Sequence, residues 1–207
     1  MSTSTLLRIR PALSTDKAAM LKTLHSALRN SNFHNRCFPF SDPTSQHQYT
    51  NWIDKNMADP TSHVIIAEEA SSATPIAGWA RWVRRSAPGP DAKPMIFTES
   101  MFPAGGDAKL AARFFQTNFD AMDKAVGRQP VWFLSMLIVP EEFEKGGVDE
   151  ELLRWGVEKA DGEGWAAFGN ATPETKSRYE EFGFRVVERH EFDGGLVTYH
   201  MKREVKS

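Results

Sequence analysis

Residues with reactive side chains are scattered singly along this sequence rather than gathered in one catalytic motif. No group of His, Asp and Glu residues has the spacing of a metal site, and neither a Gly-x-Ser-x-Gly turn nor a P-loop is present. Cys37 is the only cysteine, which excludes an internal disulfide and a multi-cysteine metal site. We therefore expect no metal, and chemistry by single acid–base side chains.

Composition limits the class of protein further. The 207 residues are 41% hydrophobic and 25% charged, which suits one domain with a full core. The formal net charge of −2 argues against a dedicated nucleic-acid binder. The longest apolar run, 131–139, is about half a membrane span, and the start MSTSTLLRIR lacks the apolar stretch of a secretory signal. We expect a cytoplasmic protein with no membrane or nucleic-acid partner.

Hydrophobic periodicity predicts alternating strands and helices. Strands are expected at 7–9, 63–67, 76–83, 131–139, 166–170, 184–187 and 196–201. Helices are expected at 16–28, 46–57, 107–125, 149–161 and 175–182. A turn at 71–74 joins two strands into a hairpin, and 85–106 is long, irregular and rich in proline and glycine. The fold class is α/β or α+β, a single domain around one central mixed sheet.

The segment 132–184 carries the most specific signal. It runs from an apolar strand through the loop EEFEKGGV to a helix, a strand, the loop ATPET and a second helix, and it ends in Tyr179-Glu-Glu-Phe-Gly-Phe184. This order resembles the acetyl-CoA-binding half of the GNAT-type N-acyltransferases. The residues at the family's loop and helix positions are Phe143, Glu144, Gly147, Asp149, Leu152 and Leu153. The resemblance extends through Ala104-Gly-Gly-Asp107 and Phe114-Phe115, typical of fungal members, to Arg8-Ile-Arg-Pro11.

The resemblance implies a GNAT-like, mostly antiparallel mixed sheet flanked by helices, with 1–130 as the acceptor-side half and 131–207 as the CoA-side half. It implies acetyl-CoA as co-substrate. The residues implied to align the thioester are Leu137, Ile138 and Val139. Those implied to hold the pyrophosphate are Glu144, Lys145, Gly146, Gly147, Val148 and Asp149. Asn170 is implied to lie near the pantetheine, and Tyr179 to protonate the departing thiolate, a role that a phenol can fill.

The loop departs from the family pattern in its charge. Glu144 stands where the family has Gln or Arg, and Asp149 where it has a small residue. Two unit charges about 5 Å apart interact by roughly 1–3 kcal/mol, so these acids are expected to weaken or abolish acetyl-CoA binding. A second interpretation stays open: Asp149 caps the helix, and Glu150 and Glu151 stabilise its positive end with the cofactor site empty.

The general base is the second open question. Many family members use a carboxylate on the strand before the loop, and here Ser135 is the only polar side chain on that strand. Other candidates are His34, His63, Glu99 and His200. Ser135 and His34 are the predicted catalytic partners of Tyr179. Each single histidine has the alternative of being a surface or packing residue, and Tyr179 itself could be core packing.

Aromatic residues are the candidates for the acceptor site. The predicted substrate-binding residues are Phe33, Phe38, Trp79, Trp82 and His200, with simple core packing as the alternative for the aromatic side chains. The segment 85–106 is a candidate lid over this site. Arg84, Arg85 and Arg178 are expected to be solvated charges.

The predicted function is transfer of an acyl group, usually acetyl, from CoA to an amine of a small molecule. The expected assembly is a monomer or a homodimer. One alternative keeps the fold but performs CoA-independent chemistry on, or binding of, a small metabolite. Another is a catalytically silent interaction module.

Overall fold

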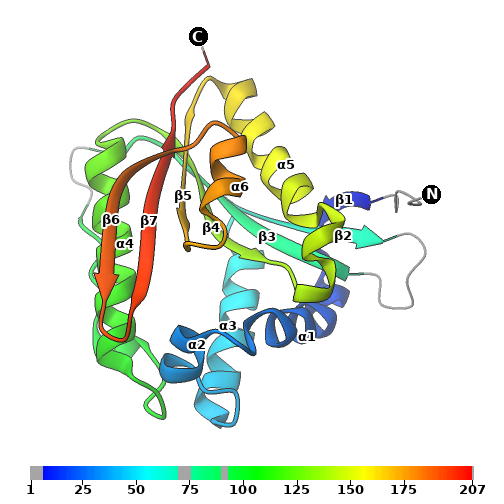
Figure 1. Ribbon diagram of the computed structural model, residues 1–207, viewed down its shortest axis with the longest axis vertical. Coiled ribbons are helices and arrows are strands. Elements are labelled where there is room, and N and C mark those ends of the chain that lie inside the picture. The colour runs from blue at the N-terminus through cyan, green and yellow to red at the C-terminus, as the bar shows by residue number, and fades with distance from the viewer. Residues whose placement is uncertain (1–6, 70–75, 90–92, 207) are drawn as a thin grey trace.

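The computed structural model describes residues 7–69, 76–89 and 93–206. One seven-stranded sheet, in the order β1-β2-β3-β4-β5-β7-β6, runs through the molecule with helices on both faces (Figure 1). The strands are β1 Leu7–Pro11, β2 Ser62–Glu69, β3 Ile76–Arg85, β4 Val131–Ile138, β5 Ala166–Ala171, β6 Arg185–Phe192 and β7 Leu196–Arg203. The α-helices are α1 Lys17–Leu28, α2 Asn32–Cys37, α3 Pro43–Ala58, α4 Ala108–Val126, α5 Val148–Glu163 and α6 Lys176–Glu181. Short 3-10 helices are η1 Ser14–Asp16, η2 Glu99–Met101 and η3 Glu141–Gly146.

The centre of the sheet holds the only parallel pair among the described strands. β4 and β5 pair from Val131 opposite Ala166 to Leu134 opposite Gly169, and all other neighbours are antiparallel. Beyond Leu134 and Gly169 the strands diverge, because β4 continues along β3 while β5 continues along β7. A shift in the register between β3 and β4 leaves Ser135 of β4 in a bulge where this divergence begins. The result is a gap in the middle of the sheet.

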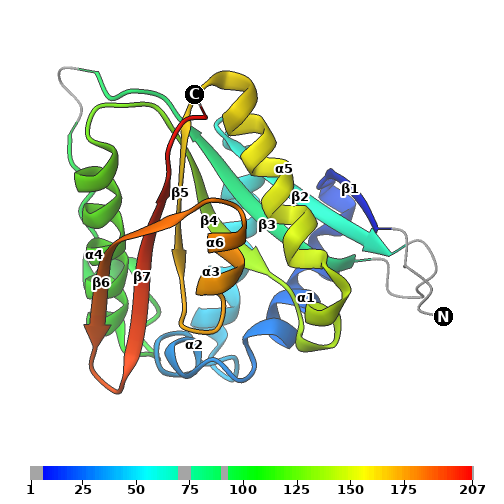
Figure 2. The ribbon, with the colours of Figure 1, turned by 45° about the horizontal axis from the view of Figure 1, so that its top comes forward.

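The two faces of the sheet are covered by different helices (Figure 2). We call the side covered by α5 and α6 the α5 face, and the side covered by α1, α3 and α4 the α4 face. The core on the α5 face is mainly aliphatic, with Leu152, Leu153 and Val157 of α5 packed on the sheet. The core on the α4 face contains a cluster of aromatic rings in mutual contact, which includes Phe33, Phe38 and Tyr49. This single mixed, mostly antiparallel sheet between helices confirms the predicted fold class.

Several element bounds differ from the sequence-based expectation. Helix α2 was not expected; its N-cap Ser31 accepts a hydrogen bond from the His34 backbone. Helix α5 begins at Val148 behind Gly147, whose φ of 74° favours glycine, so Asp149 is not the cap. β4 was expected to be buried on both faces, but 135–137 are half-buried because β5 has moved away. The expected turn at 71–74 lies outside the described residues.

Over the part of the chain that the structure describes, none of the helices has both the length and the apolar character needed to cross a bilayer.

Candidate active site at the gap between β4 and β5

Tyr179 lies at the edge of the gap on the α5 face. Its hydroxyl donates a hydrogen bond to the Asn170 carbonyl oxygen at 3.3 Å, and its side chain is buried. The ring fits against β5 because residue 169 is glycine: a Cβ there would lie 2.8 Å from the Tyr179 ring. Burial, reinforced by the charge of Asp149, raises the pKa of Tyr179 above its ordinary value. The phenol therefore keeps its proton and can act as a donor.

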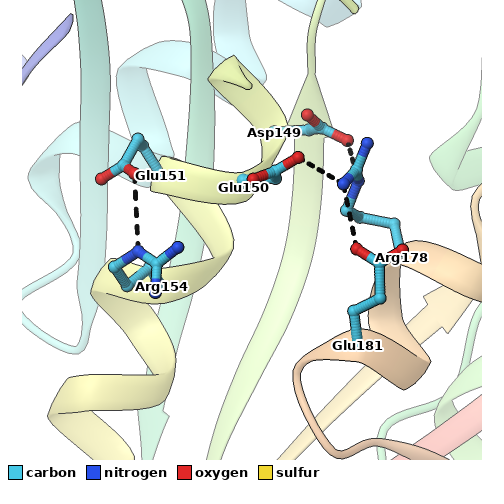
Figure 3. A network of polar contacts seen from close by, with 6 residues as sticks. All are labelled: Asp149, Glu150, Glu151, Arg154, Arg178 and Glu181. Carbon is cyan, nitrogen blue, oxygen red and sulfur yellow. Dashed lines mark hydrogen bonds and ion pairs between the residues drawn. The ribbon is translucent and has the colours of Figure 1, made fainter. Parts of the chain in front are cut away.

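Arg178, the neighbour of Tyr179, neutralises the acids at the start of α5 (Figure 3). Its guanidinium pairs with Asp149 at 2.9 Å and Glu181 at 3.0 Å, and also with Glu150. The prediction that Arg178 is a solvated charge was therefore wrong. Asp149 faces this cation, which offsets the repulsion that its charge would exert on a phosphate.

The other predicted pyrophosphate residues form the turn before α5. Gly147 adopts the left-handed conformation, and Val148 is buried where it would contact a Cβ on Gly78. Glu144 and Gly146 are exposed on this turn, and the side chain of Lys145 lies outside the described part of the structure. The turn brings the free backbone amides of the α5 N-terminus to the end of the gap. Such an end stabilises a bound anion.

The predicted thioester-aligning residues lie along one wall of the gap. Leu137 and Ile138 pair with β3 on one side, opposite Ala80 and Trp79, and none of the described strands pairs with them on the β5 side. Val139 follows directly and is half-buried. This wall therefore offers unpaired backbone N–H and C=O groups to an extended ligand.

Ser135 is occupied rather than free. Its hydroxyl donates to the Arg81 carbonyl oxygen at 3.3 Å and accepts from the Arg81 guanidinium at 3.2 Å. Arg81 is further held by Ser62 and Asp59. Because this hydroxyl already has both a donor and an acceptor partner, a role for Ser135 as the base is not supported.

The base candidates fall in separate places. His34 of α2 lies within 3.0 Å of the Ser31 hydroxyl, and burial lowers its pKa to about 4. His63 lies on the α5 face against Trp132, and Glu99 is exposed on η2. The structure therefore does not gather these residues into one catalytic group.

His200 was predicted to bind the substrate directly. It is fully buried on β7, so it cannot line an open substrate site. Its Nδ1 lies 2.8 Å from Asn170 Oδ1. Burial, reinforced by the neighbouring His190, lowers its pKa to about 4. Through this contact His200 touches Asn170, the first residue of β5 beyond the pairing with β4, from the β7 side.

The two tryptophans predicted to line the acceptor site are core residues on opposite faces. Trp79 is 1% exposed and donates from its indole to the Met20 carbonyl oxygen of α1. Trp82 is fully buried, donates to the Leu152 carbonyl oxygen and packs on Gly156 of α5. Because Trp79 and Trp82 are three positions apart on β3, strand alternation points their side chains to opposite faces of the sheet.

Phe33 and Phe38 belong to an aromatic cluster on the α4 face. Both are buried, so they pack within the cluster, and Phe33 lies 4.1 Å from Phe114 between ring centroids. Half-buried members that sequence reasoning did not assign to the site are Trp52, Phe97, Phe102, Phe114 and Phe115. The described part of the candidate lid is held to α4, since Gln116 accepts from the Phe97 backbone at 2.9 Å.

Two further arginines expected to be solvated are ion-paired. Arg84 contacts Glu163 at 3.0 Å, and Arg85 contacts Asp123 of α4. Neither residue was assigned to the site, and both tie β3 to a helix.

Comparisons with known proteins place this arrangement in a fold. No protein-family model and no curated protein matches the chain. A structure described as histone acetyltransferase HPA2 and related acetyltransferase, from Corynebacterium glutamicum, is 18% identical, with 97% of each chain covered and a TM-score of 0.65. A GNAT-family acetyltransferase from Desulfovibrio desulfuricans is 14% identical, with 97% of this chain and 100% of that one covered and a TM-score of 0.57.

A structure of the NatC complex bound to Gag peptide and CoA is similar in the same way. It is 12% identical, with 97% of this chain and 99% of that chain covered and a TM-score of 0.55. Identities this low establish the architecture alone. The chain has the fold of the GNAT acetyltransferases.

Proposed function

We propose that the protein transfers an acetyl group from acetyl-CoA to an amine of a small molecule. The observation that carries the proposal is the gap between β4 and β5 with the buried, protonated Tyr179 at its edge. Acetyl-CoA would supply the activated thioester. The chain's own groups would do the rest: bind, orient and donate a proton.

The site's residues fit such a co-substrate. The backbone at 136–138, which pairs with β3 but not with β5, would align an extended pantetheine arm, and the amides behind Gly147 would meet the pyrophosphate. Arg178 adds a guanidinium that can share its charge between Asp149 and a phosphate. The CoA-independent alternative rested on repulsion between the pyrophosphate and the two acids Asp149 and Glu144. Because Asp149 pairs with Arg178, its share of that repulsion is offset.

Tyr179 would donate its hydroxyl proton to the thiolate as the thioester carbon–sulfur bond breaks. The amine nitrogen forms the new bond to the acetyl carbon and loses a proton to solvent, and Tyr179 regains its proton from solvent, so acetyl-CoA and amine give amide and free CoA. Among the described residues the candidates for a general base lie apart from one another, so the amine would enter deprotonated. The rate is then expected to rise with pH as the free amine becomes more abundant.

The test is acetylation of a panel of primary amines by the purified protein. Release of free CoA thiol together with a mass increase of one acetyl group on an amine is the expected result. Titration calorimetry with acetyl-CoA is run in parallel. Absence of both binding and thiol release above spontaneous hydrolysis would reject the proposal.

A further inference from the structure

A polar chain on the α4 face crosses β5, β7 and β6 and has no role in the steps above. His200 Nδ1 lies 2.8 Å from Asn170 Oδ1, and His200 Nε2 lies 3.3 Å from His190 Nδ1. An amide oxygen only accepts, so His200 Nδ1 carries the hydrogen and Nε2 accepts one from His190. The hydrogen bonds therefore all point the same way, with His190 donating to His200 and His200 donating to Asn170.

Its outer end is anchored on α4. The carboxylate of Glu188 lies 3.8 Å from His190 Nδ1 and accepts a hydrogen bond from Lys124 at 2.9 Å. The inner end fixes Asn170, the first β5 residue beyond the last pair with β4. Because Oδ1 is held toward β7, the Asn170 amide nitrogen points away from His200. Its two N–H groups have no hydrogen-bond acceptor within the part of the chain that the structure describes and can donate to a ligand.

Helix α4 carries a second carboxamide, Asn118, on its buried side. Asn118 is 8% exposed, and its Oδ1 has no hydrogen-bond partner among the described residues. An oxygen that has lost its water without gaining a donor destabilises the free protein. An unpartnered acceptor in a packed helix face is what a site for an N–H donor requires.

Contacts at both ends of α4 fix the level of Asn118. Arg113 contacts Asp193 at 3.3 Å and Lys124 contacts Glu188 at 2.9 Å, so α4 runs antiparallel to β6. With a rise of about 1.5 Å per helical residue and about 3.3 Å per strand residue, the two spans have equal length. Asn118, midway between the contacts, is therefore level with His190, next to the His200–Asn170 pair.

We propose that Asn118 and Asn170 bind the acceptor amine on the α4 side of the gap, with His200 and His190 as positioning residues for Asn170. This inference rests on the proposed function. The amine donates an N–H to Asn118 Oδ1, and Asn170 donates to an oxygen beside the reacting centre. The acceptor class is thus a small primary amine, held by neutral carboxamides rather than by a carboxylate.

The test compares Asn118→Leu with Thr117→Val, which removes a hydroxyl at the adjacent position, about 100° round the helix. The amine is the best substrate from the acetylation panel. For Asn118→Leu we expect its KM to rise roughly threefold to tenfold, the worth of one hydrogen bond. The KM for acetyl-CoA and the Tm should not fall. Thr117→Val should leave both KM values unchanged, and Asn118→Ala replaces the leucine variant if that one does not fold.

His200→Leu and His200→Asn test the positioning role. The leucine variant should lower kcat/KM for the amine several-fold, and the asparagine variant, whose amide can still donate to Asn170, should restore part of it. Equal losses in both variants at equal Tm would reject the positioning role. An unchanged amine KM in the Asn118 variants, with normal acetylation by the wild type, would reject the inference alone. Absence of acetylation by the wild type would reject the proposed function, and this inference with it.

Discussion

The two faces of the sheet are built on different physical terms. On the α5 face, backbone and side chains approach closely at glycines, as where Trp82 packs on Gly156 and Tyr179 on Gly169. Charges there are concentrated at the start of α5 and compensated by Arg178. On the α4 face, a cluster of aromatic rings packs beside a polar chain from Glu188 to Asn170, and Asn118 Oδ1 has no hydrogen-bond partner among the described residues.

This difference separates what two ligands would need. A site made of strand edges, a glycine turn and a helix N-terminus recognises a ligand through backbone groups, which many sequences can supply. A site made of aromatic rings and two carboxamides recognises a ligand through side chains, which are particular to this chain. The first suits a common co-substrate and the second a specific acceptor. Four predictions test this division, from the largest expected effect to the smallest.

The close approach on the α5 face is tested by Gly156→Ala. An added Cβ would lie 1.9 Å from the Trp82 ring, so the helix or the indole must move. We expect the free energy of unfolding to fall by about 3 kcal/mol. Gly162→Ala is the matched control on the same helix, because a Cβ there would meet nothing within 4 Å. The control should gain about 0.5–1 kcal/mol from helix propensity. Equal unfolding midpoints in urea would contradict the tight packing.

The proton donor is tested by Tyr179→Phe, which removes one hydroxyl and little volume. We expect kcat to fall roughly 10²-fold or more at nearly unchanged Tm. Because burial raises the pKa of Tyr179, the wild-type phenol stays protonated beyond the ordinary tyrosine value of about 10. The wild-type kcat should therefore show no alkaline loss up to that pH. Unchanged turnover in the variant would assign Tyr179 to core packing.

The charge balance at the start of α5 is tested by two substitutions of opposite effect. Arg178→Gln removes the cation and should weaken acetyl-CoA binding about tenfold, whereas Asp149→Asn frees the guanidinium and should strengthen it by up to that factor. Both shifts should shrink as salt is raised. Calorimetry at two salt concentrations measures this. Shifts of the same sign would mean that the network is structural only.

The last prediction concerns an ion pair that connects α5 to β7 on the α5 face. The nearly buried Arg203 of β7 contacts Asp161 of α5 at 2.6 and 3.0 Å. The hydrogen bonds from Arg203 lower the pKa of Asp161, so the pair stabilises the fold above the ordinary aspartate pKa of about 3.9. This stabilisation is lost as the pH falls through the lowered value.

We expect Asp161→Asn to cost about 1–2 kcal/mol of unfolding free energy from pH 5 to 8. The difference from the wild type should begin to narrow below about pH 4, where Asp161 becomes protonated in the unfolded chain, and should close once the pH has fallen through the lowered pKa of the folded protein. Unfolding curves of both proteins over this pH range measure it. A difference that does not depend on pH would assign the effect to packing.

Local patterns carried much of the information on the fold and part of that on the site. The periodicity at 107–125 corresponds to α4 over Ala108–Val126. Such a pattern is informative because the buried face of an amphipathic helix requires apolar residues at helical spacing. The glycine before α5 and the tyrosine before the last two strands lie in short segments whose order the sequence shows directly. The family resemblance implied cofactor-site roles for Gly147 and Tyr179; in the structure Gly147 directly precedes α5, and Tyr179 lies at the edge of the gap.

Misassigned residues were those whose partners are distant in the chain. Trp82 lies on a strand that sequence reasoning located correctly, but only the packing of α5 shows that Gly156 receives its indole. From the sequence, Asp149 was interpreted as a helix cap or as a charge that repels the cofactor. Its partner in the structure, the guanidinium of Arg178, lies on another helix. Neither outcome follows from spacing, because the free energy of an ion pair or a buried ring depends on which surfaces meet.

The sequence by itself determined the alternation of strands and helices, the family-like loop and tyrosine, and the acidic character of the α5 start. These depend on local spacing and composition, which the chain carries whatever its partners. Three features depend on the tertiary structure alone. Asp149 pairs with Arg178, and His200 contacts the side chain of Asn170. On the α4 face, Asn118 Oδ1 has no hydrogen-bond partner among the described residues. Divergence of β4 and β5, set by the competing pairings with β3 and β7, creates the gap that these residues surround.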